Sequence, residues 1–118
     1  MKSKGGKAHP FHLSPEERSI LEGADDLLRT EIGHLAGDGG LRIAILSHRG
    51  VREFRLLISR EVWDRCSQEI MRFSAVLHSE LLRKDAVCCS APEPRLVDDS
   101  LDKTYNGWWI FAWPLKVE

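Results

Sequence analysis

The stretch that decides the fold is residues 41–59, which read LRIAILSHRGVREFRLLIS. It contains two runs rich in Leu, Ile and Phe, residues 41–47 and residues 51–59, and charged side chains alternate with apolar ones in the second run. The link over residues 47–50 (SHRG) has the length and the terminal glycine of a hairpin loop. The stretch therefore predicts two antiparallel strands joined by a tight turn.

A helix is predicted on the N-terminal side of this hairpin. Ser14 can cap the free backbone N–H groups, Pro15 suits the first helical position, and Glu17 can complete a capping box. Apolar residues then recur at the spacing of one helix face. They are Ile20, Leu21, Ala24, Leu27, Leu28, Ile32 and Leu35. The glycine-rich residues 37–40 (GDGG) end the helix.

A second helix is predicted on the C-terminal side of the hairpin, with Ser59 as its cap and Arg83-Lys84 near its end, where positive charge suits the helix dipole. Its apolar stripe has a regular helical period. The stripe consists of Trp63, Cys66, Ile70, Phe73, Leu77 and Leu81.

Two further strands are predicted in the last third of the chain. The short apolar run over residues 86–91 is typical of a strand, which Pro92 and Pro94 would end. Residues 95–106 are polar and acidic and predict a loop that finishes at the turn signal Asn106-Gly107. The final strand is predicted over residues 108–117.

The predicted order of elements is helix, strand, strand, helix, strand, strand. Hairpins favour an antiparallel sheet, and helices with one apolar stripe favour packing on one side of it. We therefore expect an α+β, two-layer domain with two long helices packed on one face. The 118 residues fit a single domain over residues 14–118. Residues 1–13 are basic and lack periodicity, which predicts a flexible tail.

The sequence also bears on location. It holds no run of about 18 apolar residues, so we expect no membrane association. The basic N-terminus is followed by no apolar segment, unlike a secretory signal. An odd set of cysteines, Cys66, Cys88 and Cys89, is a poor disulfide framework and favours a reducing, cytoplasmic location.

Residue patterns for catalysis or cofactor binding are weak. His9 and His12 have metal-ligand spacing, but the rest of a zinc site is missing from their surroundings in sequence. Asp25 and Asp26 diverge by about 100° on a helix and do not form a pair. Residues 37–40 follow a helix, whereas a phosphate loop precedes one. We therefore expect no metal, no cofactor and no catalytic residues, and hence a protein that is not an enzyme.

Charge is segregated along the chain although the net charge is only −1. Residues 41–60 carry five arginines against one glutamate and follow an acidic first helix. Guanidinium groups suit phosphate, and a two-stranded ribbon can enter the DNA major groove. The residues of this hypothesis are Arg42, His48, Arg49, Arg52 and Arg55. Alternatively, these side chains solvate the hairpin or pair with the acidic helix.

Tryptophan is concentrated at the C-terminal end, where three of the four tryptophans fall between positions 108 and 113. Strand alternation places Trp109, Phe111, Trp113 and Leu115 on one face, and Trp108, Ile110 and Ala112 on the other. One face can fill the core while the other presents an aromatic surface of the kind found at interfaces. Alternatively, the strand is covered on both faces.

These features favour a small cytosolic interaction protein that acts stoichiometrically as a regulator, inhibitor or assembly subunit. Its partner would be another protein or a second copy of itself. The expected contact residues, with arginines at a loop tip or long enough to reach outward, are Trp108, Trp109, Trp113, Arg49, Arg52 and Arg55. The alternatives are a nucleic-acid-binding module that uses the hairpin over residues 41–60, and a small enzyme whose site is not visible in the sequence.

Overall fold

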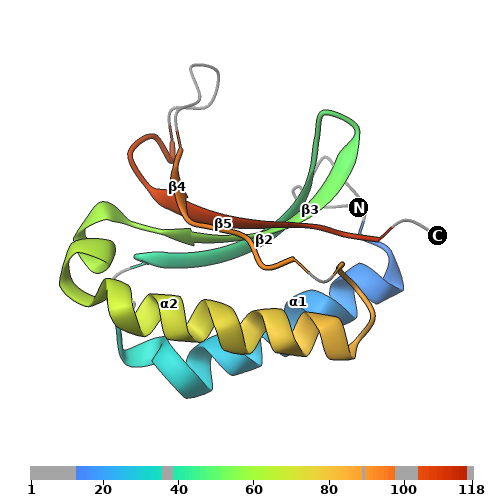
Figure 1. The fold of residues 1–118 in the computed structure, drawn as a ribbon, viewed down its shortest axis with the longest axis horizontal. Coiled ribbons are helices and arrows are strands. Elements are labelled where there is room, and N and C mark those ends of the chain that lie inside the picture. Colours follow the sequence, from blue (N-terminus) through green and yellow to red (C-terminus); the bar gives the residue numbers. More distant parts are fainter. Residues whose placement is uncertain (1–12, 36–38, 89, 98–103, 117–118) are drawn as a thin grey trace, which may run out of the picture.

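The predicted order of elements is confirmed in the computed structural model, which describes residues 13–35, 39–88, 90–97 and 104–116 (Figure 1). Six elements and one short 3₁₀ turn make up this part of the chain. They are α1 (Pro15–Ile32), the turn η1 (Gly33–Leu35), β2 (Leu41–His48), β3 (Val51–Ile58), α2 (Arg60–Arg83), β4 (Arg95–Leu96) and β5 (Trp109–Pro114).

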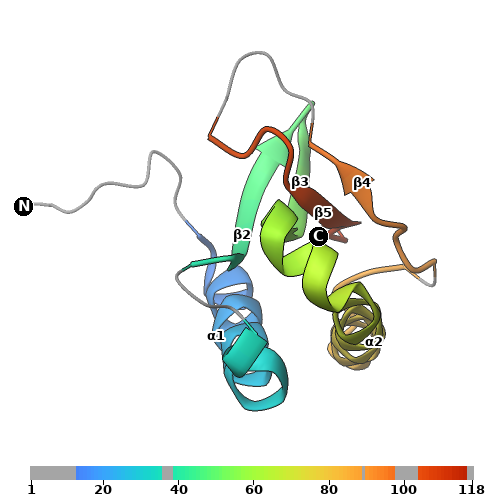
Figure 2. The same cartoon turned by 90° about the vertical axis from the view of Figure 1, so that its left-hand side faces the viewer.

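The elements form two layers. The strands make one antiparallel sheet in the order β2-β3-β5-β4. Figure 1 shows both helices on the same side of this sheet, and Figure 2 shows α1 beneath β2 and α2 on the side of β5 and β4. The predicted two-layer α+β domain with two long helices on one face is therefore confirmed. The sheet face that carries the helices is called the inner face below, and the opposite one the outer face.

The strand register explains why the inner face is a continuous core. Ile43 pairs with Leu56, which pairs with Phe111, so one row of apolar side chains crosses three strands. The helix stripes pack onto such rows, and Ile70 and Leu77 of α2 are fully buried against them. Each Å² of apolar surface removed from water stabilises the fold by about 25 cal/mol, so this core is the main stabilising contribution. Leu13, which was assigned to the tail, also packs against the core.

The predicted helix caps are confirmed. Ser14 and Glu17 form the reciprocal capping box of α1, and the Ser59 side chain accepts a hydrogen bond from the backbone N–H of Val62 in α2. One feature of α2 was not expected. The backbone at Cys66 leaves the helical region (φ −144°, ψ 41°), and the helix is kinked there. The segment before the kink carries Trp63, which stacks on Trp109 with ring centroids 4.6 Å apart.

The predicted hairpin is confirmed, with a loop shorter than the four-residue link. Strands β2 and β3 pair as far as His48 and Val51, so only Arg49 and Gly50 form the turn. Both have positive φ, 53° and 79°. This is the conformation of a type I′ turn, whose twist matches that of the flanking strands.

The strand predicted over residues 86–91 is wrong. Among the described residues of this run no strand forms, and Val87 makes an isolated bridge to Leu115. Val87 is buried in the core. Packing against other elements, and not a strand, therefore accounts for the apolar residue at this position. The fourth strand is instead Arg95–Leu96, in the segment predicted as a loop. The turn signal at Asn106-Gly107 is confirmed, with φ of 84° at Gly107.

Candidate functional site

The outer face of the sheet combines arginines with apolar side chains. Strand pairing puts four side chains in one row across the four strands: Arg42, Leu57, Ile110 and Arg95. An arginine therefore stands at each end of the row and two apolar residues lie between them. No helix in the described part of the chain covers this face (Figure 2).

The turn before β5 covers the centre of this row. Leu57 and Ile110 are only 5% and 1% exposed although they lie on the face without helices. Tyr105 and Trp108 belong to the β4–β5 connection, and their rings meet edge to face at 5.0 Å. Backbone hydrogen bonds join the two described ends of this connection: the N–H of Val97 donates to Trp108, and the N–H of Gly107 donates to Val97. This short segment therefore supplies the aromatic side chains of the outer face.

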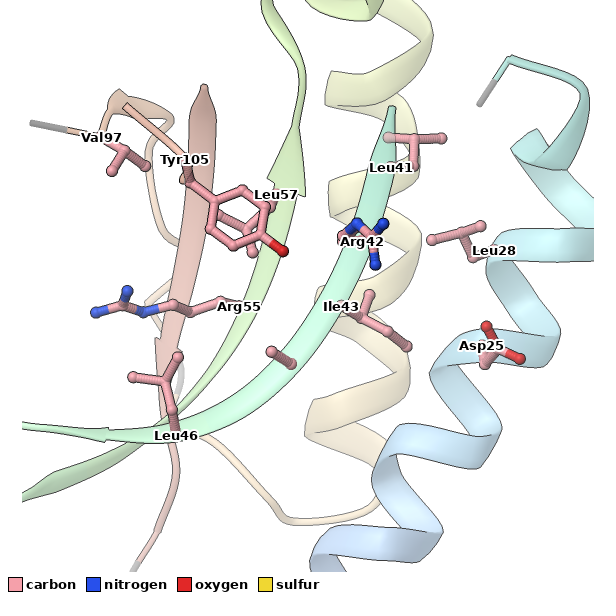
Figure 3. A pocket seen from close by; sticks show the side chains of 11 residues that line it. Asp25, Leu28, Leu41, Arg42, Ile43, Leu46, Arg55, Leu57, Val97 and Tyr105 are labelled. Atoms are coloured by element: carbon pink, nitrogen blue, oxygen red, sulfur yellow. The ribbon is translucent and has the colours of Figure 1, made fainter. Parts of the chain in front are cut away.

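A pocket of about 500 Å³ lies along β2, and we call it the β2 groove. Its lining residues are Asp25, Leu28, Leu41, Arg42, Ile43, Ala44, Leu46, Arg55, Leu57, Val97 and Tyr105. In Figure 3, Leu28 points from α1 toward β2 on one side, and Tyr105 lies on the other side. Strand β2 thus forms the floor, α1 forms one wall, and Val97 and Tyr105 form the other.

The backbone of β2 is unpaired on the side of the groove. Strand β2 is an edge of the sheet, and the N–H of Ser59 donates to the carbonyl of Gly40 at 2.8 Å. Backbone groups in an antiparallel ladder alternate in direction. Counting from this bond, Arg42, Ala44, Leu46 and His48 point their N–H and C=O groups to β3. The intervening residues, Leu41, Ile43, Ile45 and Ser47, point theirs away from the sheet, where no described strand pairs with them.

Two arginines of the hairpin are engaged in ion pairs. Arg52 lies on the inner side and donates from Nε and Nη2 to the two carboxylate oxygens of Glu17, at 2.9 and 3.0 Å. These bonds lower the pKa of Glu17 and raise the pKa of Arg52. Arg55 lies on the outer face and donates from Nε to Glu53 at 3.0 Å. Arg52 therefore fastens the hairpin to the start of α1 and does not reach outward as expected.

The other basic residues of the hairpin lie apart from these pairs. Arg42 and Arg49 are exposed, and neither forms an ion pair within the described residues. Arg42 lines the groove, whereas Arg49 stands in the turn at the far end of the hairpin. His48 is half-buried beside this turn. The five residues named for nucleic-acid binding are thus divided between the two faces and the tip.

The three C-terminal tryptophans have different surroundings. Trp113 is buried in the core, and its Nε1–H donates to Nδ1 of His78 at 3.1 Å. Trp109 faces the same side and stacks on Trp63. Trp108 packs against Tyr105 beside the groove. Of the three, only Trp108 lies where a partner at the groove could contact it. Trp108 is therefore a candidate contact residue of the groove, whereas Trp109 and Trp113 are not.

The remaining candidate residues do not gather into a site. Cys66 is buried and its thiol donates to the carbonyl of Val62, whereas Cys88 is exposed. Within the described residues no group of three or more His, Cys, Asp or Glu side chains is placed to hold a metal ion. His9, His12 and Cys89 lie outside the described residues. None of the helices described has the length and apolar character needed to cross a membrane.

Comparisons with protein families, with curated proteins and with solved structures find no match to this chain. The groove must therefore be interpreted from its own chemistry. Sequence reasoning named Arg42 and Arg55 but missed the apolar residues of the groove and Tyr105, although one signal was present. Leu56, Leu57 and Ile58 are consecutive apolar residues, which breaks the alternation and indicates a strand that is covered on both faces.

Proposed function

We propose that this protein is a protein-binding module that acts stoichiometrically, as a regulator, inhibitor or assembly subunit, and that its contact surface is the β2 groove. The observation that carries the proposal is the position of the groove along β2, an edge strand of eight residues that pairs with β3 on one side and with no described strand on the other. Strand edges and apolar pockets are both common sites of protein recognition.

The residues around the groove support a protein partner. A few side chains provide most of the binding energy of a typical interface, and Trp, Tyr and Arg are enriched among them. The groove and its margin offer one of each type: Trp108, Tyr105 and Arg42. Their neighbour Leu46 is half-buried and provides apolar area that a partner can bury. An apolar floor with a polar margin is the usual anatomy of a protein interface.

The alternative of a nucleic-acid partner has less support from the geometry. Ion pairs already neutralise Arg52 and Arg55. Arg42, His48 and Arg49 are left as the basic side chains of the hairpin, and a complex built on them would weaken steeply with added salt.

Site-specific crosslinking in cells of the source organism tests this proposal. A photoreactive amino acid at Leu46, in the groove, should yield a covalent adduct with one protein, and nuclease treatment should not remove it. The matched control is the same amino acid at Met71, which is 45% exposed on α2 and distant from the groove residues in sequence. Equal labelling from both positions, a nuclease-sensitive adduct, or no adduct from Leu46 would contradict the proposal.

A further inference from the structure

We infer that the partner binds as an added strand, in which an extended segment of alternating apolar and acidic residues pairs with the free edge of β2. This inference rests on the proposed function and specifies the chemistry of the partner at the same site. It follows from the backbone groups, the walls and the charges of the groove.

The backbone of β2 provides the pairing surface. The groove spans residues 41–46, a length of about 20 Å in an extended strand, and this span includes the outward-directed backbone groups of Leu41, Ile43 and Ile45. A second strand beside β2 would satisfy these groups with main-chain hydrogen bonds, which contribute affinity independently of side chains.

The edge of β2 also lacks most of the features that usually prevent such pairing. Proteins protect sheet edges with short strands, bulges, proline or charged side chains, above all lysine. Strand β2 pairs continuously with β3 over all eight residues, contains neither Lys nor Pro, and has one charged side chain at the groove, Arg42. The opposite edge, β4, is only two residues long. Of the two sheet edges, β2 is therefore the one suited to accept a strand.

The position of α1 selects a single segment as the occupant, in place of a second copy of the chain. Helix α1 lies beneath β2, and Asp25 and Leu28 form the wall on its side of the groove (Figures 2 and 3). A copy related by a two-fold axis would bring its own α1 under the same edge, and the two helices would compete for one space. A lone extended segment brings no helix and can lie above α1.

The side chains of the groove specify the sequence of the segment. Alternate residues of an added strand face opposite sides of the sheet. Those on the inner side would meet Leu28 and Ile43, which favour apolar, β-branched residues. Those on the outer side would meet Arg42 and Tyr105, and a carboxylate beside Arg42 would form a charge-assisted hydrogen bond. Asp25 does not compete for a basic residue, because Arg29 pairs with it at 2.7 Å.

A peptide library tests the pattern directly. Twelve-residue random peptides displayed on phage would be selected on the full chain, and the winners synthesised as free peptides. We expect them to alternate apolar with acidic residues and to lose about tenfold or more in affinity when the backbone nitrogens that face β2 are methylated. Methylation of the intervening nitrogens should have little effect. Winners with helical spacing, or binding that is indifferent to methylation, would overturn the inference.

A matched pair of variants tests the protein side. Ile43→Pro and Ile43→Ala both remove the branched Ile43 side chain, but only the proline removes the outward N–H of this residue. Peptide affinity should therefore fall about tenfold further in Ile43→Pro than in Ile43→Ala. Arg42→Glu should weaken acidic peptides and favour peptides with lysine at the same position. Equal affinities of the two position-43 variants would contradict strand addition, and the methylated peptides give the same answer if Ile43→Pro does not fold.

The two proposals can fail separately. If Leu46 crosslinks to a partner protein whose binding is equal in the Ile43→Pro and Ile43→Ala variants, the groove is an interface but strand addition is wrong. If no protein is crosslinked in cells, the proposed function is wrong, whatever the peptides show.

Discussion

The buried indole of Trp113 depends on one acceptor. Its N–H lies in the core and donates to Nδ1 of His78, a side chain that α2 directs toward β5. A buried donor that loses its acceptor costs about 1–3 kcal/mol, which exceeds the net contribution of an ordinary hydrogen bond. His78 is thus placed to act as a structural residue, a role that no local sequence pattern indicated.

We expect His78→Leu to lower the free energy of unfolding by about 1–3 kcal/mol, measured by urea denaturation. In a Trp113→Phe background, which lacks the donor, the same substitution should cost much less. The comparison separates the hydrogen bond from other contacts of His78. Equal costs in the two backgrounds would show that the bond contributes nothing.

The ion pair between Glu17 and Arg52 makes stability depend on pH. Hydrogen bonds from Arg52 lower the pKa of Glu17 below its ordinary value of 4.5. The stabilisation is therefore complete above pH 4.5 and is lost as the pH falls through the lowered pKa. Glu17→Gln keeps the capping box but removes the charge, and it should cost about 1–2 kcal/mol at neutral pH.

Urea denaturation at a series of pH values checks this expectation. The difference between the natural chain and Glu17→Gln should shrink as the solution becomes acidic. Glu16→Gln, one residue earlier and without an ion pair to a described residue, is the matched control and should have little effect. A pH-independent difference for Glu17→Gln would exclude the ion pair as its cause.

At the level of elements, the β2–β3 hairpin is set by its turn. Arg49 occupies a left-handed conformation that costs an ordinary L-residue about 1 kcal/mol, whereas Asn tolerates it. Arg49→Asn should therefore raise the free energy of unfolding by about 0.5–1 kcal/mol. Gly50→Ala, at φ 79°, should lower it by about 1 kcal/mol or more. Thermal denaturation measures both, and a destabilised Arg49→Asn chain would contradict this account of the turn.

The elements also show how far the sequence determines the fold. The hairpin and both helices were predictable because periodicity, caps and turn residues agree locally, as at Ser14 and Gly50. The prediction of a strand over residues 86–91 failed, because the apolar character of Val87 reflects its burial by elements distant in sequence. The site was predictable only in part. Arg42 was named, but the partners of Arg52 and Arg55 depend on tertiary contacts that no local pattern encodes.

For the whole molecule, the position of α1 under the free edge of β2 predicts how the chain behaves alone. Edge-to-edge pairing of two copies would bring two α1 helices into one space, so we expect a monomer in solution. Sedimentation equilibrium should give the mass of one chain. A dimer that Ile43→Pro dissociates and Ile43→Ala does not would show that a second copy, and not a separate segment, occupies this edge.

The tryptophans of the molecule lie in different surroundings, and this bears on its intrinsic fluorescence. Trp108 lies against Tyr105 beside the groove, Trp63 stacks on Trp109, and Trp113 lies in the core. Indole fluorescence responds to the polarity of its surroundings. A ligand that enters the groove displaces water near Trp108 and alters its emission, whereas the emission of Trp113 changes only when the core opens. Binding and unfolding are therefore expected to change the emission of different indoles, Trp108 and Trp113.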